Sequence, residues 1–355
     1  MPCIAAGHDF RDDFEVRFRE LKFLLKSLAG QRGKKRWQCV VGVSGGKDST
    51  RQALWVREKL GLNPLLVSVV YPPRQVSQVG VDNLSNLIRL GFDTLALGPA
   101  PDLSRQLVRE AFLKFGNWAK ATEMCLFSGV PKIALAKGIR LILWGENPAL
   151  SVGDSGTLGS SIWDGSNLIN SNTLAGGNLD WFIEVASNSN RLPMYHYPDA
   201  VVLKKEKINT VFLGPAWKDW SAEINSEVAF VHGFRHRLAP PDETGEFLGT
   251  QMVDEDYFLV NMMIKYFKYG FSFATEQANF MIRRGQITRE EAIHFVEKYD
   301  GLCDDKYISS FCEYIQITET DFWLNVKRFA NRDIFDLSGS RPVKRFKVGY
   351  KLHHA

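Results

Sequence analysis

CVVGVSGGKDST, residues 39–50, is the stretch around which the rest of the sequence is organised. Its small and β-branched start predicts a buried strand, and residues 44–50 predict a tight turn. Apolar residues recur at helical spacing after the turn, so we expect a helix to begin there. Strand, turn and helix start together direct several backbone N–H groups at one point, where the helix dipole adds about half a positive charge. The stretch therefore predicts an anion site, and its serines and Lys47 favour phosphate over carboxylate.

The spacing of this loop excludes a Walker A motif. A Walker A loop has four residues between its glycines and a Ser or Thr directly after the lysine. Here three residues separate Gly42 from Gly46, and Asp48 follows Lys47. The run SGGKDS, residues 44–49, instead resembles the signature of the N-type ATP pyrophosphatases, or PP-loop enzymes. That resemblance implies that the loop holds the β,γ-pyrophosphate of ATP while AMP passes to a substrate oxygen, from which a nucleophile displaces it.

Composition narrows the class of protein. With 355 residues, 45% of them hydrophobic and 24% charged, the chain has the composition of an ordinary soluble globular protein. The net charge of +4 is concentrated in the last fifteen residues, which hold five basic residues and no acid, so the rest carries about −1. This balance argues against a nucleic-acid-binding surface. The five basic residues are Arg341, Lys344, Arg345, Lys347 and Lys351.

Cysteine usage and hydropathy suggest a cytoplasmic protein. The five cysteines form no CxxC pair and no metal-ligand spacing, which suits a reducing compartment. There is no signal peptide and no apolar run near eighteen residues, so no membrane span is expected.

Strands and helices alternate along the first two thirds of the chain. After a helix over 10–30, this pattern predicts an α/β fold with a parallel, doubly wound sheet of the PP-loop (adenine nucleotide alpha hydrolase-like) type. Beyond Pro240 the alternation stops and an α-helical C-terminal part follows, with a capping box at 288–291. The expected strands are 37–43, 65–70, 94–97, 141–144 and 211–213. The expected helices are 77–90, 102–115, 122–137, one reaching about 230, 255–270, 288–299, 304–315 and 318–331.

These elements predict four regions. Residues 1–36 form an N-terminal helix, and 37–235 form the α/β domain, with a mobile loop at 151–180 that is rich in Gly, Ser and Asn. Residues 240–335 form the helical part, and 336–355 form a basic tail that we expect to be an exposed arm.

Ligands of such sheets bind where the strands end, at the carboxyl edge. Val69 and Val70 end the second strand and are candidates for contact with adenine, although a purely structural role is equally consistent. Gly145, Glu146 and Asn147 follow the fourth strand, where they could act on ATP phosphates through Mg²⁺ or on a reacting carbonyl; an ordinary turn is the alternative. In the loop 151–180, Trp163 could stack on a sugar.

Several further segments, in this order, resemble the N-acetyl sugar amidotransferases of bacterial surface-polysaccharide (lipopolysaccharide, O-antigen) biosynthesis. The resemblance spans roughly residues 12–335. Its segments are VGVSGGKDS (41–49), KLGLNPLLV (59–67), ILWGENP (142–148), FLG followed by DW (212–220), KYGF with AT (up to 275), IRRGQITREEA (282–292) and KYDG (298–301).

The resemblance implies an ATP-dependent C–N ligase with Mg²⁺ as cofactor. ATP would adenylate the carbonyl oxygen of an acetamido group on a nucleotide sugar, and ammonia would displace AMP to leave an acetamidino group. Carried over to this sequence, Ser44, Gly45, Gly46, Lys47, Asp48 and Ser49 would bind pyrophosphate. Lys47 would neutralise the leaving group, and Asp48 would cap the helix or hold Mg²⁺. Glu146 and Asn147 would act at the sugar or metal. Arg283 and Arg284 could clamp the sugar-nucleotide diphosphate, and an exposed pair of charges at a helix end is the alternative; Thr275 is a weaker candidate.

The resemblance also implies partners. Family members are similar in taking ammonia from a separate glutaminase, often through a cyclase-like relay partner, and no glutaminase nucleophile is evident in this chain. Two departures stand out. Family members begin with paired cysteines that look zinc-binding, whereas this chain has only Cys3, so no structural zinc is expected; and Phe273 stands where the family tends to have arginine.

Two other functions remain open from the sequence. A PP-loop enzyme that thiolates tRNA or makes lysidine would favour a catalytic cysteine pair or a basic groove, and neither is evident. A non-catalytic ATP-binding assembly subunit is the second, because the cysteine pairs and the arginine are missing.

Overall fold

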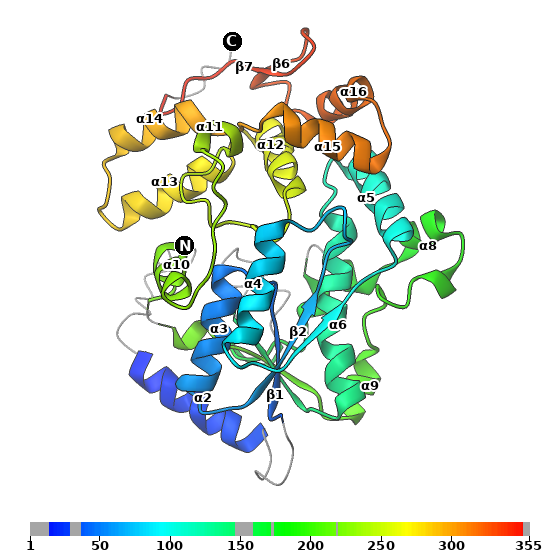
Figure 1. Ribbon diagram of the computed structural model, residues 1–355, viewed down its shortest axis with the longest axis vertical. Coiled ribbons are helices and arrows are strands. Elements are labelled where there is room, and N and C mark those ends of the chain that lie inside the picture. Colours follow the sequence, from blue (N-terminus) through cyan, green and yellow to red (C-terminus); the bar gives the residue numbers. More distant parts are fainter. Residues whose placement is uncertain (1–13, 29–36, 146–158, 172–173, 218, 351–355) are drawn as a thin grey trace. The chain divides into compact units, whose positions relative to one another are not determined.

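The computed structural model describes residues 14–28, 37–145, 159–171, 174–217 and 219–350 (Figure 1). The chain divides into two compact units that exchange segments. The first contains the residues up to Tyr71, Gly80–Ala100 and Thr122–Arg235, and the second contains Pro72–Val79, Pro101–Ala121 and the residues from His236 onward.

A five-stranded parallel sheet forms the centre of the first unit. Its strands lie in the order β3-β2-β1-β4-β5, and every neighbouring pair is parallel. The predicted doubly wound α/β fold is therefore confirmed. Because the chain winds outward from β1 in both directions, the order reverses between β1 and β4, which is where such sheets bind ligands. The strands are β1 (Cys39–Gly42), β2 (Pro64–Val69), β3 (Thr94–Leu97), β4 (Leu141–Trp144) and β5 (Asn209–Phe212).

Helices cover both faces of this sheet, because alternate strand residues point to opposite sides. Cys39 and Val41 pack in a core with α2 (Phe14–Leu28), α3 (Lys47–Glu58) and α4 (Gln78–Arg89). Val40 packs on the other face with Val130 and Ala134 of α6 (Lys120–Lys137). On the first face, α10 (Ala222–Val231) lies against α3, which places polar residues of α10 beside the start of that helix (Figure 1).

The segment expected to be a mobile loop differs from that expectation in its described part. Residues 159–171 and 174–180 form turns and the short helical turns η2 (Leu168–Asn170) and η3 (Ala175–Gly177). The amide of Phe212 donates to the Trp163 carbonyl at 2.9 Å, so this segment pairs with the edge strand β5. Trp163 is 9% exposed and packs in the sheet core, which leaves little of its ring free, and its role in stacking on a sugar stays a prediction. Short helices α8 (Asp180–Ala186) and α9 (Ala200–Lys205) follow.

The second unit is helical and includes a helix from the middle of the alternating region. We expected residues 102–115 to cover the sheet, but α5 (Pro101–Phe115) belongs to the C-terminal helices. Phe112 stacks on Phe322 with 5.2 Å between ring centroids and meets Phe311 edge-on at 5.6 Å. The other helices of this unit are α11 (Pro241–Thr244), α12 (Tyr257–Tyr269), α13 (Phe273–Arg283), α14 (Arg289–Tyr299), α15 (Asp305–Ile315) and α16 (Glu319–Phe329).

The ends of these elements test two local predictions. The capping box at the start of α14 is confirmed, with Thr288 and Glu291 each bonded to the other's backbone amide. The basic tail is not a free arm where it is described, because β6 (Phe335–Asp336) and β7 (Val343–Lys344) pair antiparallel. Lys344 also forms an ion pair with Glu297, so the basic side chains that we expected to be exposed are partly used in packing.

Candidate nucleotide site

The turn after β1 is built on two glycines with different tasks. Gly45 has φ +90°, a conformation that residues with a Cβ rarely adopt, and a Cβ there would lie 2.9 Å from the backbone nitrogen of Leu84 in α4. Gly46 has φ −65° and ψ 168° and is the N-cap residue of α3. The sequence therefore needs glycine at 45 for the turn itself, and Gly46 brings the chain into the helix.

The start of α3 has no side-chain cap. Its first helical hydrogen bond is the 2.9 Å bond from the Thr50 amide to the Gly46 carbonyl, so the amides of the three residues before Thr50 precede the helical ladder. Ser44 accepts from the Gly46 amide at 3.2 Å, and the Ser49 hydroxyl donates to the Gly46 carbonyl at 3.1 Å. An uncapped helix N-terminus with a flanking serine is suited to an anion.

Lys47 and Asp48 form an ion pair in the first turn of α3. Lys47 is 3% exposed, and its ammonium lies 2.8 Å from Oδ2 of Asp48. The other oxygen, Oδ1, accepts a 2.6 Å hydrogen bond from the side-chain amide of Asn225 in α10. Asp48 does not cap the helix, which was one of its two predicted roles. Its carboxylate instead fixes the lysine ammonium beside the uncapped amides.

A second layer holds Asn225. The guanidinium of Arg51, 7% exposed, donates to the Asn225 carbonyl oxygen at 2.6 Å and to Oδ1 of Asp219 at 2.6 Å. Arg51 also lies over the ring of Trp217, with 5.8 Å between the guanidinium carbon and the ring centroid. These contacts fix which end of the Asn225 amide faces Asp48, because its oxygen is taken by a donor and only its NH₂ group is left for the carboxylate.

The end of β4 also lies beside the first turns of α3. Gly145 lies so close to α3 that a Cβ there would meet Oε1 of Gln52 at 2.7 Å. Gln52 in turn donates to the Leu143 carbonyl at 3.1 Å. The chain exits of β1 and β4 thus meet beside the first turns of α3, at the point where the strand order reverses. Glu146 and Asn147, predicted to act here, lie outside the described residues.

The end of β2 gives less support to an adenine contact. The Val70 amide donates to the Leu97 carbonyl at 2.8 Å, so this N–H is already used within the sheet. Val69 is buried in the sheet. A role of Val70 toward adenine stays a prediction that would depend on its side chain and carbonyl.

Three predicted substrate residues lie in the second unit, on one helix. Thr275 donates its hydroxyl to Asp300 at 2.6 Å, which ties the start of α13 to the end of α14. Arg283 and Arg284 are exposed at the other end of α13. Phe273, which stands in place of a family arginine, is 5% exposed and packs with Leu259 and Met262. The contacts within this unit give Thr275 and Phe273 structural roles, and substrate binding by Thr275, Arg283 and Arg284 stays a prediction.

Sequence reasoning missed the network around Asn225. Asn225 and Asp219 lie far along the chain from the loop; Asp219 was noted only as part of the DW segment of the family resemblance, and Asn225 only as part of a helix. One sequence signal was present. The first half of α3 is polar, with Lys47, Thr50, Arg51 and Gln52, although a helix that follows a buried strand is expected to pack on a neighbouring element. A buried polar helix face requires polar partners on a neighbouring element.

Comparison with known proteins adds one family match. Residues 246–349 match the family of the LPS biosynthesis protein WbpG-like, C-terminal domain. The match lies within the second unit and covers under a third of the chain. It associates this part of the protein with lipopolysaccharide biosynthesis.

Other comparisons give less. Among curated proteins, no sequence matches the chain. Among solved structures, the chain is similar to the U34-tRNA thiolase NcsA from Methanococcus maripaludis with its [4Fe-4S] cluster. The two are 13% identical over 61% of this chain and 72% of that one, with a TM-score of 0.26.

Across the described residues, every helix is too short or too polar to cross a membrane.

Proposed function

We propose that the protein is an ATP-dependent amidotransferase that converts an acetamido group of a nucleotide sugar into an acetamidino group during surface-polysaccharide biosynthesis. The observation that carries this proposal is the uncapped start of α3, with the buried ammonium of Lys47 held beside it by Asp48. The match of residues 246–349 to a lipopolysaccharide biosynthesis family supports the pathway.

The proposed reaction has two steps. The acetamido oxygen attacks the α-phosphorus of ATP, the bond to the bridging oxygen breaks, and pyrophosphate leaves. Ammonia then attacks the activated carbon, the C–O bond breaks, AMP leaves, and loss of a proton gives the amidine. Adenylation is needed because an amide oxygen is a poor leaving group, whereas a phosphate ester oxygen is a good one.

Each residue of the loop has a part in this scheme. The amides at the start of α3 and the hydroxyls of Ser44 and Ser49 would hold the β,γ-pyrophosphate. Lys47 would neutralise the charge that develops on the departing pyrophosphate, a role in which a fixed charge in a partly dehydrated site is most effective. Asp48 has one side open to solvent, so it is the described carboxylate of the loop that could meet Mg²⁺ bound with ATP.

Ammonia is proposed to come from a separate glutaminase, with or without a relay partner. The chain's described cysteines offer no reactive nucleophile of their own. Cys39, Cys125 and Cys312 are buried and Cys303 is partly buried. Burial raises the pKa of the Cys125 and Cys303 thiols to about 12, so both stay protonated at neutral pH. The same burial gives no support to tRNA thiolation by these cysteines.

The test is to incubate the protein with ATP, Mg²⁺, ammonium and a panel of acetamido sugar nucleotides. We expect AMP and pyrophosphate only when sugar nucleotide and ammonium are both present, and a product whose mass fits oxygen replaced by NH. Release of ADP would contradict the adenylation step.

The variant Lys47→Ala should lower kcat by roughly 10²-fold or more, the usual scale for loss of one group that stabilises developing charge. Lys59→Ala, at the exposed far end of α3, is the matched control and should leave kcat unchanged. If Lys47→Ala keeps its full activity, the loop is not the site of pyrophosphate departure.

A further inference from the structure

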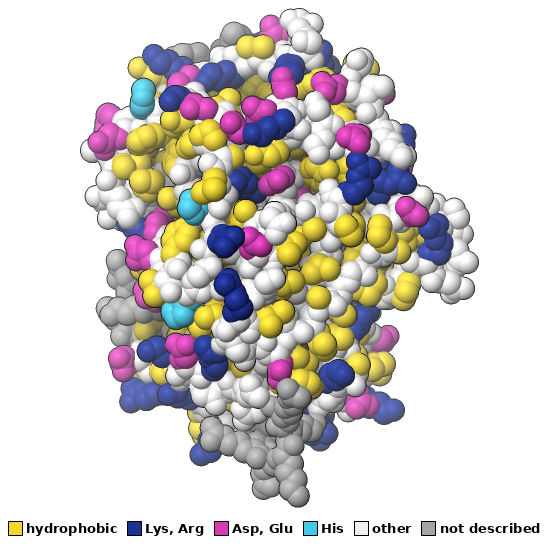
Figure 2. Space-filling view, viewed as in Figure 1, with side chains coloured by type: hydrophobic (Ala, Val, Ile, Leu, Met, Phe, Trp, Pro, Cys, Tyr) yellow, Lys and Arg dark blue, Asp and Glu magenta, His cyan; other side chains and the backbone are white. Residues whose placement is uncertain are grey.

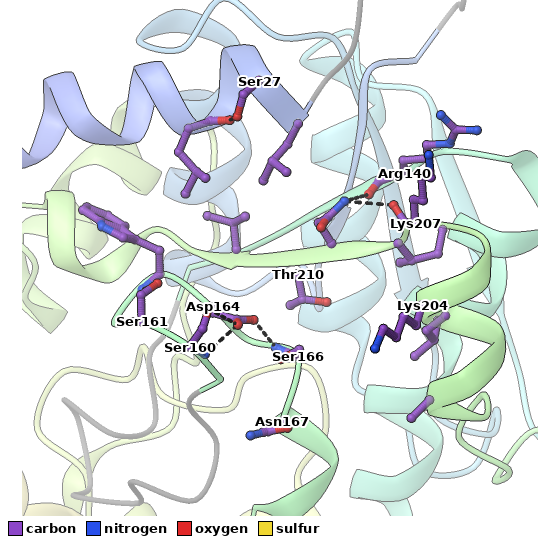
Figure 3. Close-up of a pocket in the computed structure, with 18 of the residues that line it drawn as sticks. Ser27, Arg140, Ser160, Ser161, Asp164, Ser166, Asn167, Lys204, Lys207 and Thr210 are labelled. Carbon is purple, nitrogen blue, oxygen red and sulfur yellow. Dashed lines mark hydrogen bonds between the residues drawn. The ribbon is translucent and has the colours of Figure 1, made fainter.

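A cavity lies in the first unit, away from the phosphate loop. It has a volume of about 800 Å³ and follows the outer edge of β5, between α2, α9 and residues 160–167 (Figure 3). Arg140 and Asn209, which line it, stand at the amino ends of β4 and β5, whereas Gly45 and Gly145 follow the carboxyl ends of β1 and β4. Its size is that of sites for small molecules.

One wall of the cavity is a fixed polar cluster. Oδ2 of Asp164 accepts from the Ser160 amide at 2.7 Å and the Ser160 hydroxyl at 2.9 Å, and Oδ1 accepts from the Ser166 amide at 2.9 Å. Gly165 allows this wall to approach β5, because a Cβ there would lie 2.8 Å from the Thr210 side chain. The cluster is therefore preorganised by the chain itself.

The cluster presents acceptors to the cavity. Burial acts to raise the pKa of Asp164, but the hydrogen bonds from Ser160 and Ser166 outweigh it and lower the pKa below its ordinary value. Asp164 is thus a carboxylate at neutral pH with capacity for a further donor. The Ser160 hydroxyl donates its hydrogen bond to Asp164, so its oxygen is left as an acceptor. Groups of this kind recognise the hydroxyls of a sugar.

The opposite wall supplies positive charge. In Figure 3 the side chain of Lys204 extends from α9 toward Thr210, on the same side of β5 as Asp164 and Ser166. The lining holds three cations, Arg140, Lys204 and Lys207, against one carboxylate. Within the described residues, none of these three cations forms an ion pair. A ligand with hydroxyls at Asp164 and an anionic group at Lys204 would complement both walls.

The rest of the lining is apolar. Leu24 and Leu28 of α2, Leu203 of α9 and Ile208 contribute aliphatic surface to the cavity lining. A mixed wall of aliphatic groups and fixed acceptors suits a sugar ring, which has apolar C–H faces and a polar rim.

We propose that this cavity binds a sugar phosphate, with its hydroxyls on the Ser160–Asp164–Ser166 cluster and its phosphate at Lys204. This site is separate from the nucleotide site and does not depend on the proposed reaction.

Calorimetry at constant ionic strength tests the proposal. The probes are glucose 6-phosphate, glucose 1-phosphate and glucosamine 6-phosphate, together with glucose and inorganic phosphate as the separate halves, each up to roughly 10 mM so that a Kd near 1 mM is measured. We expect saturable binding of at least one sugar phosphate, at least tenfold tighter than either half. Failure of all three sugar phosphates to bind overturns the proposal.

Variants assign the binding to the cavity. Lys204→Ala should weaken sugar phosphate binding at least tenfold, and so should Thr210→Val, because Thr210 lines the cavity on the strand that Lys204 approaches. Lys205→Ala is the matched control, because Lys205 is exposed on the same helix and does not line the cavity, and it should bind as the wild type does. Equal loss in the two lysine variants would show general charge attraction and would overturn the site.

A fold check accompanies each variant, because Thr210 lies in β5. The melting temperature of Thr210→Val should match that of the wild type. If it does not, the loss of binding in Lys204→Ala still tests the proposal. Lys47→Ala should bind the sugar phosphate normally, and saturating ATP should not displace it. Competition by ATP would place the probe at the nucleotide site and contradict the proposal.

Discussion

At the scale of single residues, the site depends on one amide. Asn225 bonds Asp48 with its NH₂ group and Arg51 with its oxygen, both at 2.6 Å. Because Asp48 holds the Lys47 ammonium in place, a substitution of Asn225 should displace that ammonium, although Asn225 itself has no proposed contact with ATP.

Asn225→Ala should therefore lower kcat/KM for ATP by roughly ten- to hundredfold, because the lysine is no longer fixed in place. It should also cost about 1–3 kcal/mol in free energy of unfolding, since the buried Arg51 and the half-buried Asp48 each lose a bond. Asn86→Ala is the control: Asn86 is a buried amide that donates to the His232 carbonyl at 2.8 Å. It should lose stability alone, and an equal loss of activity in both variants would count against a positioning role for Asn225.

The two glycines of the turn should respond differently to alanine. Gly45→Ala meets both a positive φ and a backbone atom at 2.9 Å, so we expect a loss of roughly 1–3 kcal/mol or more and no ATP binding. At Gly46 the nearest neighbour is the Ser44 hydroxyl at 3.2 Å and φ is ordinary, so Gly46→Ala should cost under about 1 kcal/mol. Chemical denaturation and titration with an ATP analogue measure both; similar losses would disprove the distinction.

At the scale of elements, a helix start in the second unit gives a local test. Thr288→Ala removes the capping box of α14 and should cost about 1 kcal/mol. Thr288→Ser keeps the hydroxyl and should stay close to the wild type. Urea denaturation compares the two, and an unchanged midpoint for Thr288→Ala would mean that the capping box at the start of α14 contributes nothing to stability.

Helices and strands with a clear hydrophobic period were predictable from the sequence, but the elements against which they pack were not. The phosphate loop and the five strands follow from local pattern, because a buried parallel strand is a short apolar run and a glycine turn precedes a helix. The periodicity of α5 gives its apolar face but not the surface that this face covers, so Phe112 was assigned to the wrong layer. The helix α13 was not predicted, because the residues around Phe273 were assigned to a family motif and their helical spacing was not considered.

The site residues show the same difference: those adjacent in sequence were predicted, and those brought together by packing were not. The loop from Ser44 to Ser49 was found from contiguous residues. The bond between Asp48 and Asn225 joins positions 177 apart, and only the packing of α10 on α3 creates it. A tertiary hydrogen bond of this kind leaves no local pattern to detect.

At the scale of the whole molecule, a buried carboxyl should make stability depend on pH. Glu255 is 0% exposed, and the charge of Arg237 and the backbone amide of Phe258 favour its ionised form less than burial disfavours it. Burial first, then the charges of Asp254 and Asp256, raise the pKa of Glu255 well above its ordinary value of 4.5. Burial likewise raises the pKa of Asp254 to about 6.

The sign follows from proton counts. Above pH 4.5 the unfolded chain has lost the Glu255 proton and the folded chain keeps it, so stability falls as pH rises, by up to about 1.4 kcal/mol per pH unit. Glu255→Gln removes this slope, and should be more stable than the wild type at neutral pH but not below pH 4.5. Urea unfolding between pH 4.5 and 8 measures the difference; parallel curves for both proteins would refute it.

The exchange of segments between the two units has a consequence for shuffling this protein with its relatives. The helical unit takes Pro101–Ala121 from within the α/β sequence, so a chimera joined near residue 236 would combine one parent's α15 and α16 with the other parent's α5. Phe112, Phe311 and Phe322 would then come from different parents and would have to fit by chance. A workable swap moves Pro72–Val79, Pro101–Ala121 and the residues from His236 onward together. The part of the gene that encodes the second unit is therefore discontinuous.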